Sequence, residues 1–270
     1  MVSQKVFIVT GASSGIGKAI AVEAVKRNNF VCIAARKEDA LVATFNELEK
    51  INPGHCVYVV ADVSIENDCK KIIDTTTQKF GKIDILINNA GVSMRAMFND
   101  LHLDVIKTLM NINFWGTVYC TKHALPYILK EKGSIVAISS IAGFTPLPAR
   151  TGYSASKGAI HGFLNTLRVE TMKSGIHIMI AAPGFTASNI RNTALTADGS
   201  AQGETPRDED KMMTAEEVAL HIFNGIEKRK RTLILTTQGK LTVLLYKFFP
   251  TFTDKLIYNH MKKEPNSPLP

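Results

Sequence analysis

Short apolar runs alternate with longer segments of helical period along most of the chain. The runs are short and mostly uninterrupted, which is typical of strands that are covered on both faces in a parallel sheet. The segments between them have the length and apolar spacing of helices. This βαβ rhythm predicts a doubly wound α/β fold. The expected strands are 6–9, 31–34, 57–60, 83–87, 134–138 and 176–180, and the expected helices are 15–28, 38–50, 66–80, 103–130 and 154–173.

The length and composition limit the classes of protein to be considered. The chain has 270 residues, of which 45% are hydrophobic and 21% are charged. These values fit a water-soluble globular protein and exclude disordered, collagenous and multi-span membrane chains. Since neither an internal repeat nor a long linker is visible, we expect one domain over 1–270.

The sequence also suggests a cellular compartment. It shows no export signal, and no apolar stretch approaches the roughly 20 residues of a membrane-spanning helix. The four cysteines (Cys32, Cys56, Cys69 and Cys120) form neither a C-x-x-C pair nor a metal-like spacing. We therefore expect reduced thiols, a cytoplasmic location and no metal site.

Positive charge is concentrated near the C-terminus. Nine basic and three acidic residues place +6 of the net charge of +8 in 226–270, interleaved with the apolar run 241–249. This basic, apolar extension either packs on its own domain or on a partner subunit, or it makes peripheral contact with an anionic membrane. The basic run 228–231 is interpreted as a solvated helix end, and no nucleic-acid partner is expected because no binding motif accompanies it.

A glycine-rich turn lies between the first expected strand and the first expected helix. It reads Thr10-Gly-Ala-Ser-Ser-Gly-Ile-Gly17. Gly11 permits a tight turn, Gly15 lets the backbone approach a pyrophosphate, and Gly17 allows close helix packing, while the helix N-terminus favours negative charge. This context predicts a dinucleotide site. Its candidate residues are Gly11, Ser13, Ser14, Gly15, Ile16 and Gly17.

The end of the second strand indicates which dinucleotide binds. Dinucleotide folds usually place an acid there for the ribose 2′-hydroxyl, but this chain reads Ala34-Ala-Arg-Lys37. An acid would repel a 2′-phosphate, whereas an arginine can form charge-assisted bonds with it. Arg36 and Lys37 therefore predict NADP(H) rather than NAD(H).

A phenol and an ammonium group lie four residues apart in Tyr153-Ser-Ala-Ser-Lys157, on one face of an expected helix. A nearby cation favours phenolate and lowers the pKa of the tyrosine, so the pair can act as an acid/base device. Ser140 lies upstream at a strand end, where ligands bind in open α/β sheets.

Several motifs occur together and in order, and with them the chain resembles the short-chain dehydrogenase/reductases over about residues 4–186. The motifs are the glycine-rich turn, Asp62-Val63, Asn88-Asn-Ala-Gly91, Asn113, Ser140, Tyr153-x-x-x-Lys157 and Pro183-Gly184. The resemblance implies a Rossmann-like three-layer fold with a seven-stranded parallel sheet. The C-terminal end is loosely similar to that of hydroxysteroid-dehydrogenase-like members.

The resemblance also implies roles for individual residues. Tyr153 would be the general acid/base and Ser140 would hydrogen-bond the carbonyl oxygen. Lys157 would lower the tyrosine pKa and hold the nicotinamide ribose, and Asn113 would stabilise a water that connects Lys157 to solvent. The remaining implied cofactor contacts are Asp62, Val63, Asn89, Ala90, Gly91, Pro183, Gly184, Thr186 and Ser188; the last replaces the threonine found in many members.

The expected activity is NADP(H)-dependent hydride transfer between nicotinamide and a secondary alcohol or carbonyl. The alternative is a catalytically silent NADP(H)-binding sensor or scaffold. Segment 188–213 lacks apolar periodicity, so it is either a substrate lid or disordered. Family members are commonly dimers or tetramers built on the helices that bear Asn113 and Tyr153, which implies a homo-oligomer. A hydrophobic substrate is predicted from apolar residues near the expected pocket, namely Met94, Phe98, Phe144, Leu147 and Phe185.

Overall fold

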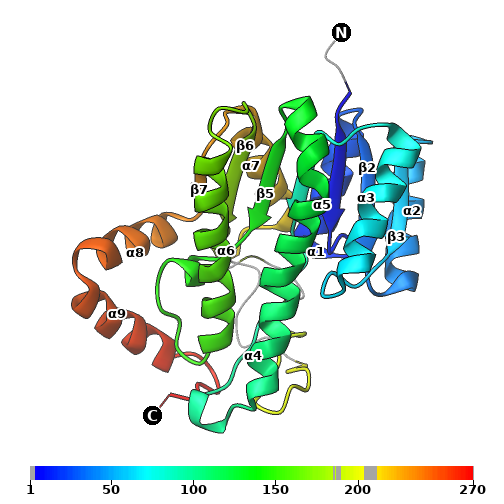
Figure 1. Ribbon diagram of the computed structural model, residues 1–270. Helices are drawn as coiled ribbons and strands as arrows, with labels where there is room; N and C mark the ends of the chain where they lie inside the picture. Colours follow the sequence, from blue (N-terminus) through cyan, green and yellow to red (C-terminus); the bar gives the residue numbers. More distant parts are fainter. Residues whose placement is uncertain (1–3, 185, 187–189, 204–211, 270) are drawn as a thin grey trace.

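The computed structural model describes residues 4–184, 186, 190–203 and 212–269. Within these residues, seven parallel strands form one sheet in the order β3-β2-β1-β4-β5-β6-β7 (Figure 1). This confirms the predicted Rossmann-like α/β fold and its seven-stranded sheet. The strands are β1 (Val6–Thr10), β2 (Phe30–Ala35), β3 (Cys56–Val60), β4 (Ile85–Asn88), β5 (Ser134–Ile138), β6 (His177–Ala182) and β7 (Thr232–Ile234).

Helices cover both faces of the sheet. Buried residues of α1, α2 and α7 pack in one cluster, and those of α3, α5 and α6 pack in another on the opposite face. The helices are α1 (Gly15–Lys26), α2 (Glu38–Ile51), α3 (Glu66–Phe80), α4 (Leu103–Leu109), α5 (Gly116–Glu131), α6 (Thr151–Glu170), α7 (Ala215–Glu227), α8 (Thr237–Phe248) and α9 (Pro250–Lys262).

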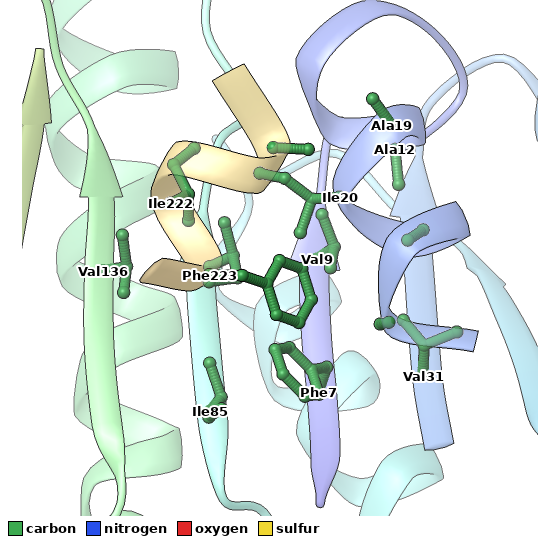
Figure 2. Close-up of a cluster of buried hydrophobic side chains, with 14 of the residues drawn as sticks. Phe7, Val9, Ala12, Ala19, Ile20, Val31, Ile85, Val136, Ile222 and Phe223 are labelled. Atoms are coloured by element: carbon green, nitrogen blue, oxygen red, sulfur yellow. The ribbon is translucent and has the colours of Figure 1, made fainter. Parts of the chain in front are cut away.

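The central strand shows why an uninterrupted apolar run forms this sheet. In β1, Phe7 and Val9 belong to the cluster on one face, and Ile8 belongs to the cluster on the other. Figure 2 shows the first of these clusters, where Phe7 and Phe223 of α7 stack with ring centroids 5.4 Å apart. Because successive side chains of a strand point to opposite faces, both faces require apolar residues.

The expected helix over 103–130 is interrupted. Its sequence forms α4, a π-helical turn over Met110–Trp115, and α5. The wider turn contains Asn113, whose side chain bonds to Val92 and Ser156 and is completely buried. Such single-turn insertions are frequent at functional sites, and apolar periodicity alone does not reveal them.

The order of the strands determines where a site can form. From β1 the chain proceeds to β2 and β3 on one side of the sheet, and β4 then pairs with the other side of β1. Ligands of open α/β sheets bind outside the carboxyl ends of the strands at such a switch point. The turn after β1, the turn after β4 and the loop after β5 meet at this edge.

The last two helices extend away from the sheet as a hairpin (Figure 1). At its root, Gly239 of α8 packs so closely on Ile141 that an added Cβ would lie 2.3 Å from Cδ1 of Ile141. The hairpin therefore begins beside the loop that follows β5. None of the described helices has the length and apolar character needed to cross a membrane.

Candidate functional site

A cavity of about 540 Å³ lies at the carboxyl ends of the central strands. It brings together residues from widely separated stretches of the sequence. The predicted site residues that line it are Gly11, Ser13, Ser14, Gly15, Ile16, Arg36, Lys37, Asp62, Val63, Asn89, Ala90, Gly91, Ser140, Tyr153, Lys157, Pro183, Gly184 and Thr186. Gly17 and Asn113 lie behind the wall, and Ser188 lies outside the described residues.

The glycine-rich turn has the geometry that the sequence predicts. Gly11 and Gly15 have φ values of +65° and +53°, a region that side chains other than glycine rarely occupy. An added Cβ on Gly17 would lie 2.4 Å from both the Gly11 carbonyl oxygen and Asn89 Nδ2. The turn is therefore closed against α1, and its backbone borders the cavity.

Polar groups hold the turn against β4. Asn89 Nδ2 donates to the carbonyl oxygens of Thr10 and Gly11, at 2.9 and 3.1 Å. The hydroxyl of Thr10 accepts the backbone N–H groups of Asn89 and Ala90, both at 3.1 Å. Thr10 precedes the glycines and was not among the predicted site residues. Its position at the last residue of β1 was the only signal for this role.

The N-terminus of α1 is open to an anion. Ser14 does not cap α1 with its side chain in the described structure, and the first turn from Gly15 contains no acidic residue. The first N–H groups of a helix lack intrahelical partners and carry the positive end of the helix dipole. The turn and α1 together therefore offer backbone donors to a phosphate or pyrophosphate.

Arg36 and Asp62 form an ion pair at the other end of the cavity. Arg36 Nη1 lies 3.5 Å from Asp62 Oδ2, and the Arg36 side chain is 56% exposed. Burial acts to raise the pKa of Asp62, but hydrogen bonds from Ser64 and the charge of Arg36 outweigh it and hold that pKa below its ordinary value. The guanidinium is thus tethered at the mouth of the cavity and remains accessible.

Tyr153, Ser140 and Lys157 converge on the inner part of the cavity. Lys157 Nζ donates to the Ile138 carbonyl oxygen at 2.9 Å and lies 5.7 Å from the centroid of the Tyr153 ring. Burial lowers the pKa of Lys157 to about 8. Both side chains come from α6, which begins at Thr151 and therefore includes Tyr153 in its first turn.

The pKa of Tyr153 differs from the sequence-based expectation. Burial raises it above its ordinary value, and the opposing groups are the Ser140 hydroxyl, which hydrogen-bonds the phenol, and the Arg150 guanidinium. The lowering effect that the sequence assigned to Lys157 therefore comes here from Ser140 and Arg150. Lys157 is itself desolvated, which disfavours its charged form.

Asn113 lies directly behind the candidate acid/base residues. Its Oδ1 accepts the Val92 N–H at 2.9 Å, and its Nδ2 donates to Val92 O at 3.0 Å and to Ser156 Oγ at 2.9 Å. An added Cβ on Gly91 would lie 3.0 Å from Asn113 Oδ1 and 3.4 Å from Lys157 Nζ. Asn113 thus joins the turn after β4 to α6 next to Lys157.

His161 packs against the loop after β5. Its Nε2 lies 2.6 Å from the hydroxyl of Ser139, which neighbours Ser140, and its ring packs against Phe144 with centroids 4.2 Å apart. Burial and the charge of Lys157 lower the pKa of His161 to about 4. His161 is therefore a structural histidine that stays neutral at physiological pH.

The lowered pKa of His161 predicts a loss of stability in acid. Between its folded value of about 4 and the ordinary value of 6.5, the unfolded chain binds more protons. The stability that the protein gains from keeping His161 neutral is therefore complete above pH 6.5 and is lost as the pH falls toward 4. The loss amounts to up to about 3 kcal/mol in the free energy of unfolding. Urea unfolding at about pH 7 and about pH 5 measures this loss.

His161→Gln provides the comparison, because glutamine keeps a hydrogen-bonding group for Ser139 and does not titrate. Between these two pH values, the free energy of unfolding should fall for the unsubstituted protein. We expect it to fall by about 2 kcal/mol less for His161→Gln. The carboxylates titrate equally in both proteins. An identical pH dependence of the two proteins would contradict a neutral, buried His161.

The C-terminal tail contacts a residue that lines the site, which the sequence did not predict. Glu264 Oε2 lies 3.7 Å from Arg150 Nη2 and 3.8 Å from Arg95 Nη2, and all three side chains are at most 10% exposed. Arg150 lines the cavity beside Tyr153. Arg95 Nη2 also donates to the carbonyl oxygens of Pro265 and Asn266, at 2.8 and 3.0 Å. The tail is thereby fixed against two loops of the site.

Part of segment 188–213 hydrogen-bonds to the loop after β4. Leu195 N donates to Ser93 O at 2.9 Å, and Arg95 N donates to Leu195 O at 2.8 Å. Ile190, Arg191, Thr193 and Leu195 line the cavity. This part of the segment therefore covers one side of the site.

Most of the apolar residues that were expected to line a substrate pocket lie elsewhere. Of the four that the structure describes, only Leu147 lines the cavity. Met94 is fully buried in a cluster with Leu109, Phe98 is 57% exposed, and Phe144 packs on His161. Phe185 lies outside the described residues. The apolar wall is formed instead by Val92, Ile112, Ile138, Leu147, Ile190 and Leu195.

Comparison with known sequences agrees with this geometry. Residues 5–198 match the family model described as short chain dehydrogenase. The chain is 43% identical over 190 residues to 11-beta-hydroxysteroid dehydrogenase-like 2 of Arabidopsis thaliana, which covers 70% of this chain and 61% of that relative. It is 35% identical over 233 residues to 11-beta-hydroxysteroid dehydrogenase-like 4A of the same plant, covering 85% of this chain and 75% of the relative.

Solved structures show the same fold. A short chain dehydrogenase/reductase from Burkholderia phymatum in complex with NAD superimposes with a TM-score of 0.82 at 22% identity, covering 99% of this chain and 98% of that one. An alcohol dehydrogenase from the archaeon Thermococcus sibiricus complexed with 5-hydroxy-NADP gives a TM-score of 0.75 at 21% identity, covering 86% and 96%. At these identities the likeness concerns the fold alone, and the two neighbours hold different nicotinamide cofactors.

Proposed function

The chain belongs to the short-chain dehydrogenase family of oxidoreductases, and from that premise we propose that it transfers a hydride between NADP(H) and a secondary alcohol or its carbonyl. The observation that carries this proposal is the single cavity that extends from the glycine-rich turn and Arg36 to Tyr153, Ser140 and Lys157. It has room for a ligand and places an acid/base group at its inner end.

The residues of the cavity fit a dinucleotide. Side chains on Gly11 and Gly17 would collide with Ala90 and Asn89, so the turn can stay closed only with glycine there, and the uncapped start of α1 suits a pyrophosphate. Asp62 and Val63 would border the adenine, and Asn89, Ala90 and Gly91 would support the ribose. Pro183, Gly184 and Thr186 would lie against the nicotinamide. The cofactor, when bound, supplies or accepts the hydride.

The chain's own residues handle the proton. In the reducing direction, the Tyr153 hydroxyl donates its proton to the carbonyl oxygen while the carbonyl carbon receives the hydride. Ser140 hydrogen-bonds the same oxygen, Arg150 and Lys157 would supply positive charge beside the phenolate that remains, and Lys157 would bind the ribose. Asn113 positions Lys157 through the turn that contains Gly91. In the oxidising direction the phenolate removes the proton from the alcohol.

The choice of NADP(H) is supported by Arg36. This guanidinium follows β2, where an acid would select NAD(H), and Asp62 holds it at the cavity mouth while most of it remains accessible. Lys37 lines the same end. The two cations suit a 2′-phosphate, which carries the charge that distinguishes the two cofactors.

Arg36→Ala tests this choice. We expect NADPH binding to weaken by roughly 1.5 to 3 kcal/mol, the scale of a hydrogen bond to a charged group, and NADH binding to stay nearly unchanged. Titrations that follow the fluorescence of the reduced nicotinamide measure both affinities. Lys50→Ala, at the far end of the adjoining α2, is the matched control. Equal losses for the two cofactors would contradict the assignment.

The wall of the cavity supports an apolar substrate. The aliphatic side chains of Ile112, Leu147, Ile190 and Leu195 line the same cavity as Tyr153, and burial of apolar area favours binding there. Segment 190–203 would act as its lid. The alternative function, a cofactor-binding sensor that does not turn over, makes different predictions for Tyr153.

Assembly and location complete the proposal. We propose a homo-oligomer because Trp115, Val169 and Met172, next to or on the helices that bear the reactive residues, are 43%, 66% and 72% exposed.

All four cysteines are buried free thiols, and burial raises the pKa of Cys32 to about 12. Such thiols suit the reducing cytosol.

A further inference from the structure

The hairpin of α8 and α9 exposes an unusual amount of apolar surface. Among the described residues, sixteen large hydrophobic side chains are exposed, and seven of them belong to this hairpin. Their exposed fractions range from 37% to 61%. Exposed apolar side chains concentrated in one element pair in this way mark an interaction site. The seven are Leu241, Leu244, Phe248, Phe249, Phe252, Leu256 and Tyr258.

Positive charge accompanies these side chains. Residues 237–263 contain five lysines and one acidic residue, Asp254, and all six are exposed. In α8, Leu241, Leu244 and Phe248 recur at the spacing of one helix face, and Lys240 and Lys247 adjoin them. In α9, Lys255 adjoins Phe252 and Leu256. The remaining lysines, Lys262 and Lys263, follow at its end.

The lysines of the hairpin indicate which kind of surface covers these apolar side chains. Lysine is depleted in the buried centres of protein interfaces, which disfavours a second protein surface. At a lipid surface the same arrangement is favourable, because lysines extend to the headgroups while the apolar side chains enter the acyl region. We propose that the α8–α9 hairpin docks the protein on an anionic lipid surface.

The root of the hairpin connects this surface to the reactive residues. Gly239 packs on Ile141, which follows Ser140, and an open groove between the hairpin and the loop after β5 is lined by Pro146, Pro148, Tyr246 and Tyr258. At the other end, Glu264 contacts Arg150 of the cavity wall. A docked hairpin would hold the substrate side of the cavity close to the lipid, from which an apolar substrate could enter. This last step rests on the proposed function; the docking does not.

Vesicle sedimentation of the full chain tests the docking. We expect the protein to sediment with vesicles of phosphatidylcholine and phosphatidylserine, to bind phosphatidylcholine alone much more weakly, and to lose binding as salt is raised. The assay needs no turnover, so its failure is distinguishable from failure of the oxidoreductase proposal.

Two sets of substitutions locate the contact. The triple variant Leu244→Ser, Phe248→Ser and Phe252→Ser should abolish sedimentation. The triple variant Lys240→Gln, Lys247→Gln and Lys255→Gln should lower the partition coefficient on anionic vesicles roughly 100-fold, because each lysine near such a surface contributes about a factor of five. The lysine variant leaves the apolar contacts intact, so it remains informative if the serine variant folds poorly.

Matched controls come from the rest of the surface. Ile65→Ser, Leu103→Ser and Leu220→Ser together change three exposed apolar residues outside the hairpin, and Lys26→Gln, Lys50→Gln and Lys71→Gln change three exposed lysines. Both control variants should sediment like the unsubstituted protein. Absence of vesicle binding, or equal losses in hairpin and control variants, would overturn the proposal.

A second copy of the chain is the competing occupant of the patch. Sedimentation velocity without lipid shows whether the hairpin triple variants change the oligomeric state. If these variants form a smaller assembly and the unsubstituted protein does not bind vesicles, lipid docking is overturned and the patch is assigned to self-association. Vesicle binding with an unchanged assembly would support it.

Discussion

Tyr153→Phe is expected to remove nearly all turnover and to leave cofactor binding intact. General acid/base catalysis by a positioned side chain contributes about 10²- to 10⁴-fold to rate, so we expect a loss of roughly 1,000-fold or more. The substitution removes only the phenolic hydroxyl, which lies beside Ser140 at the inner end of the cavity. Neither the glycine-rich turn nor Arg36 contacts this group.

The fold should tolerate this change. The Tyr153 side chain is 8% exposed and packs in a cluster with Met94, Leu109 and Ala142, where phenylalanine keeps the ring contacts. Ser140 retains the backbone N–H of Ala142 as a donor to its hydroxyl, at 3.2 Å. We therefore expect the free energy of unfolding to change by no more than about 1 kcal/mol.

Initial rates with NADPH and a panel of apolar ketones, combined with cofactor titrations, measure both expectations. Tyr119→Phe in α5, which stacks on Trp115, is the matched control and should keep full activity. Normal turnover by Tyr153→Phe would rule out the assigned acid/base role. Cofactor binding by the unsubstituted protein without turnover of any carbonyl or alcohol would instead favour the sensor.

The sheet was largely predictable because its strands are buried on both faces. An uninterrupted apolar run such as Val6–Val9 has few alternatives when helical segments flank it, and six of the strands were located to within a few residues. The seventh, Thr232–Ile234, was implied only by the family resemblance. It has three residues, of which only Leu233 is buried, so its apolar signal is weak.

The candidate acid/base pair could be proposed from the sequence because its spacing is local. Tyr153 and Lys157 occupy one helix face, and the glycines form a continuous turn. The contacts of Glu264 with Arg95 and Arg150 join residues far apart in the sequence, and no periodicity encodes such a pairing. The interruption at Asn113 was also hidden, because π-helical and α-helical turns have similar apolar patterns.

Lys157→Met is expected to separate activity from stability. Turnover should fall by about 10²- to 10⁴-fold, because the phenolate of Tyr153 loses its neighbouring cation and the ribose loses a donor. Burial lowers the pKa of Lys157 to about 8, which shows that the fold holds the charged form in an unfavourable environment. Methionine has a similar length and carries no charge, so the variant should be at least as stable near neutral pH.

The pH dependence of unfolding measures how much the buried charge of Lys157 destabilises the fold. The folded pKa of Lys157 lies below its ordinary value of 10.5, so the unfolded chain binds more protons between about 8 and 10.5. The destabilisation is therefore complete below pH 8 and is relieved as the pH rises through this interval. At neutral pH it amounts to about 1 to 3 kcal/mol, which Lys157→Met should recover, less the hydrogen bond to the Ile138 carbonyl oxygen.

Urea unfolding at about pH 7 and about pH 9.5 checks both parts of the expectation. Between these values the unsubstituted protein should gain stability relative to Lys157→Met, and Lys130→Met, which changes an exposed lysine of α5, should behave like the unsubstituted protein. A variant that loses stability at neutral pH as well as activity would mean that the hydrogen bond of Lys157 outweighs its desolvation. A variant that is stable but inactive would show that the fold bears the cost of a buried ammonium for the sake of the phenolate beside it.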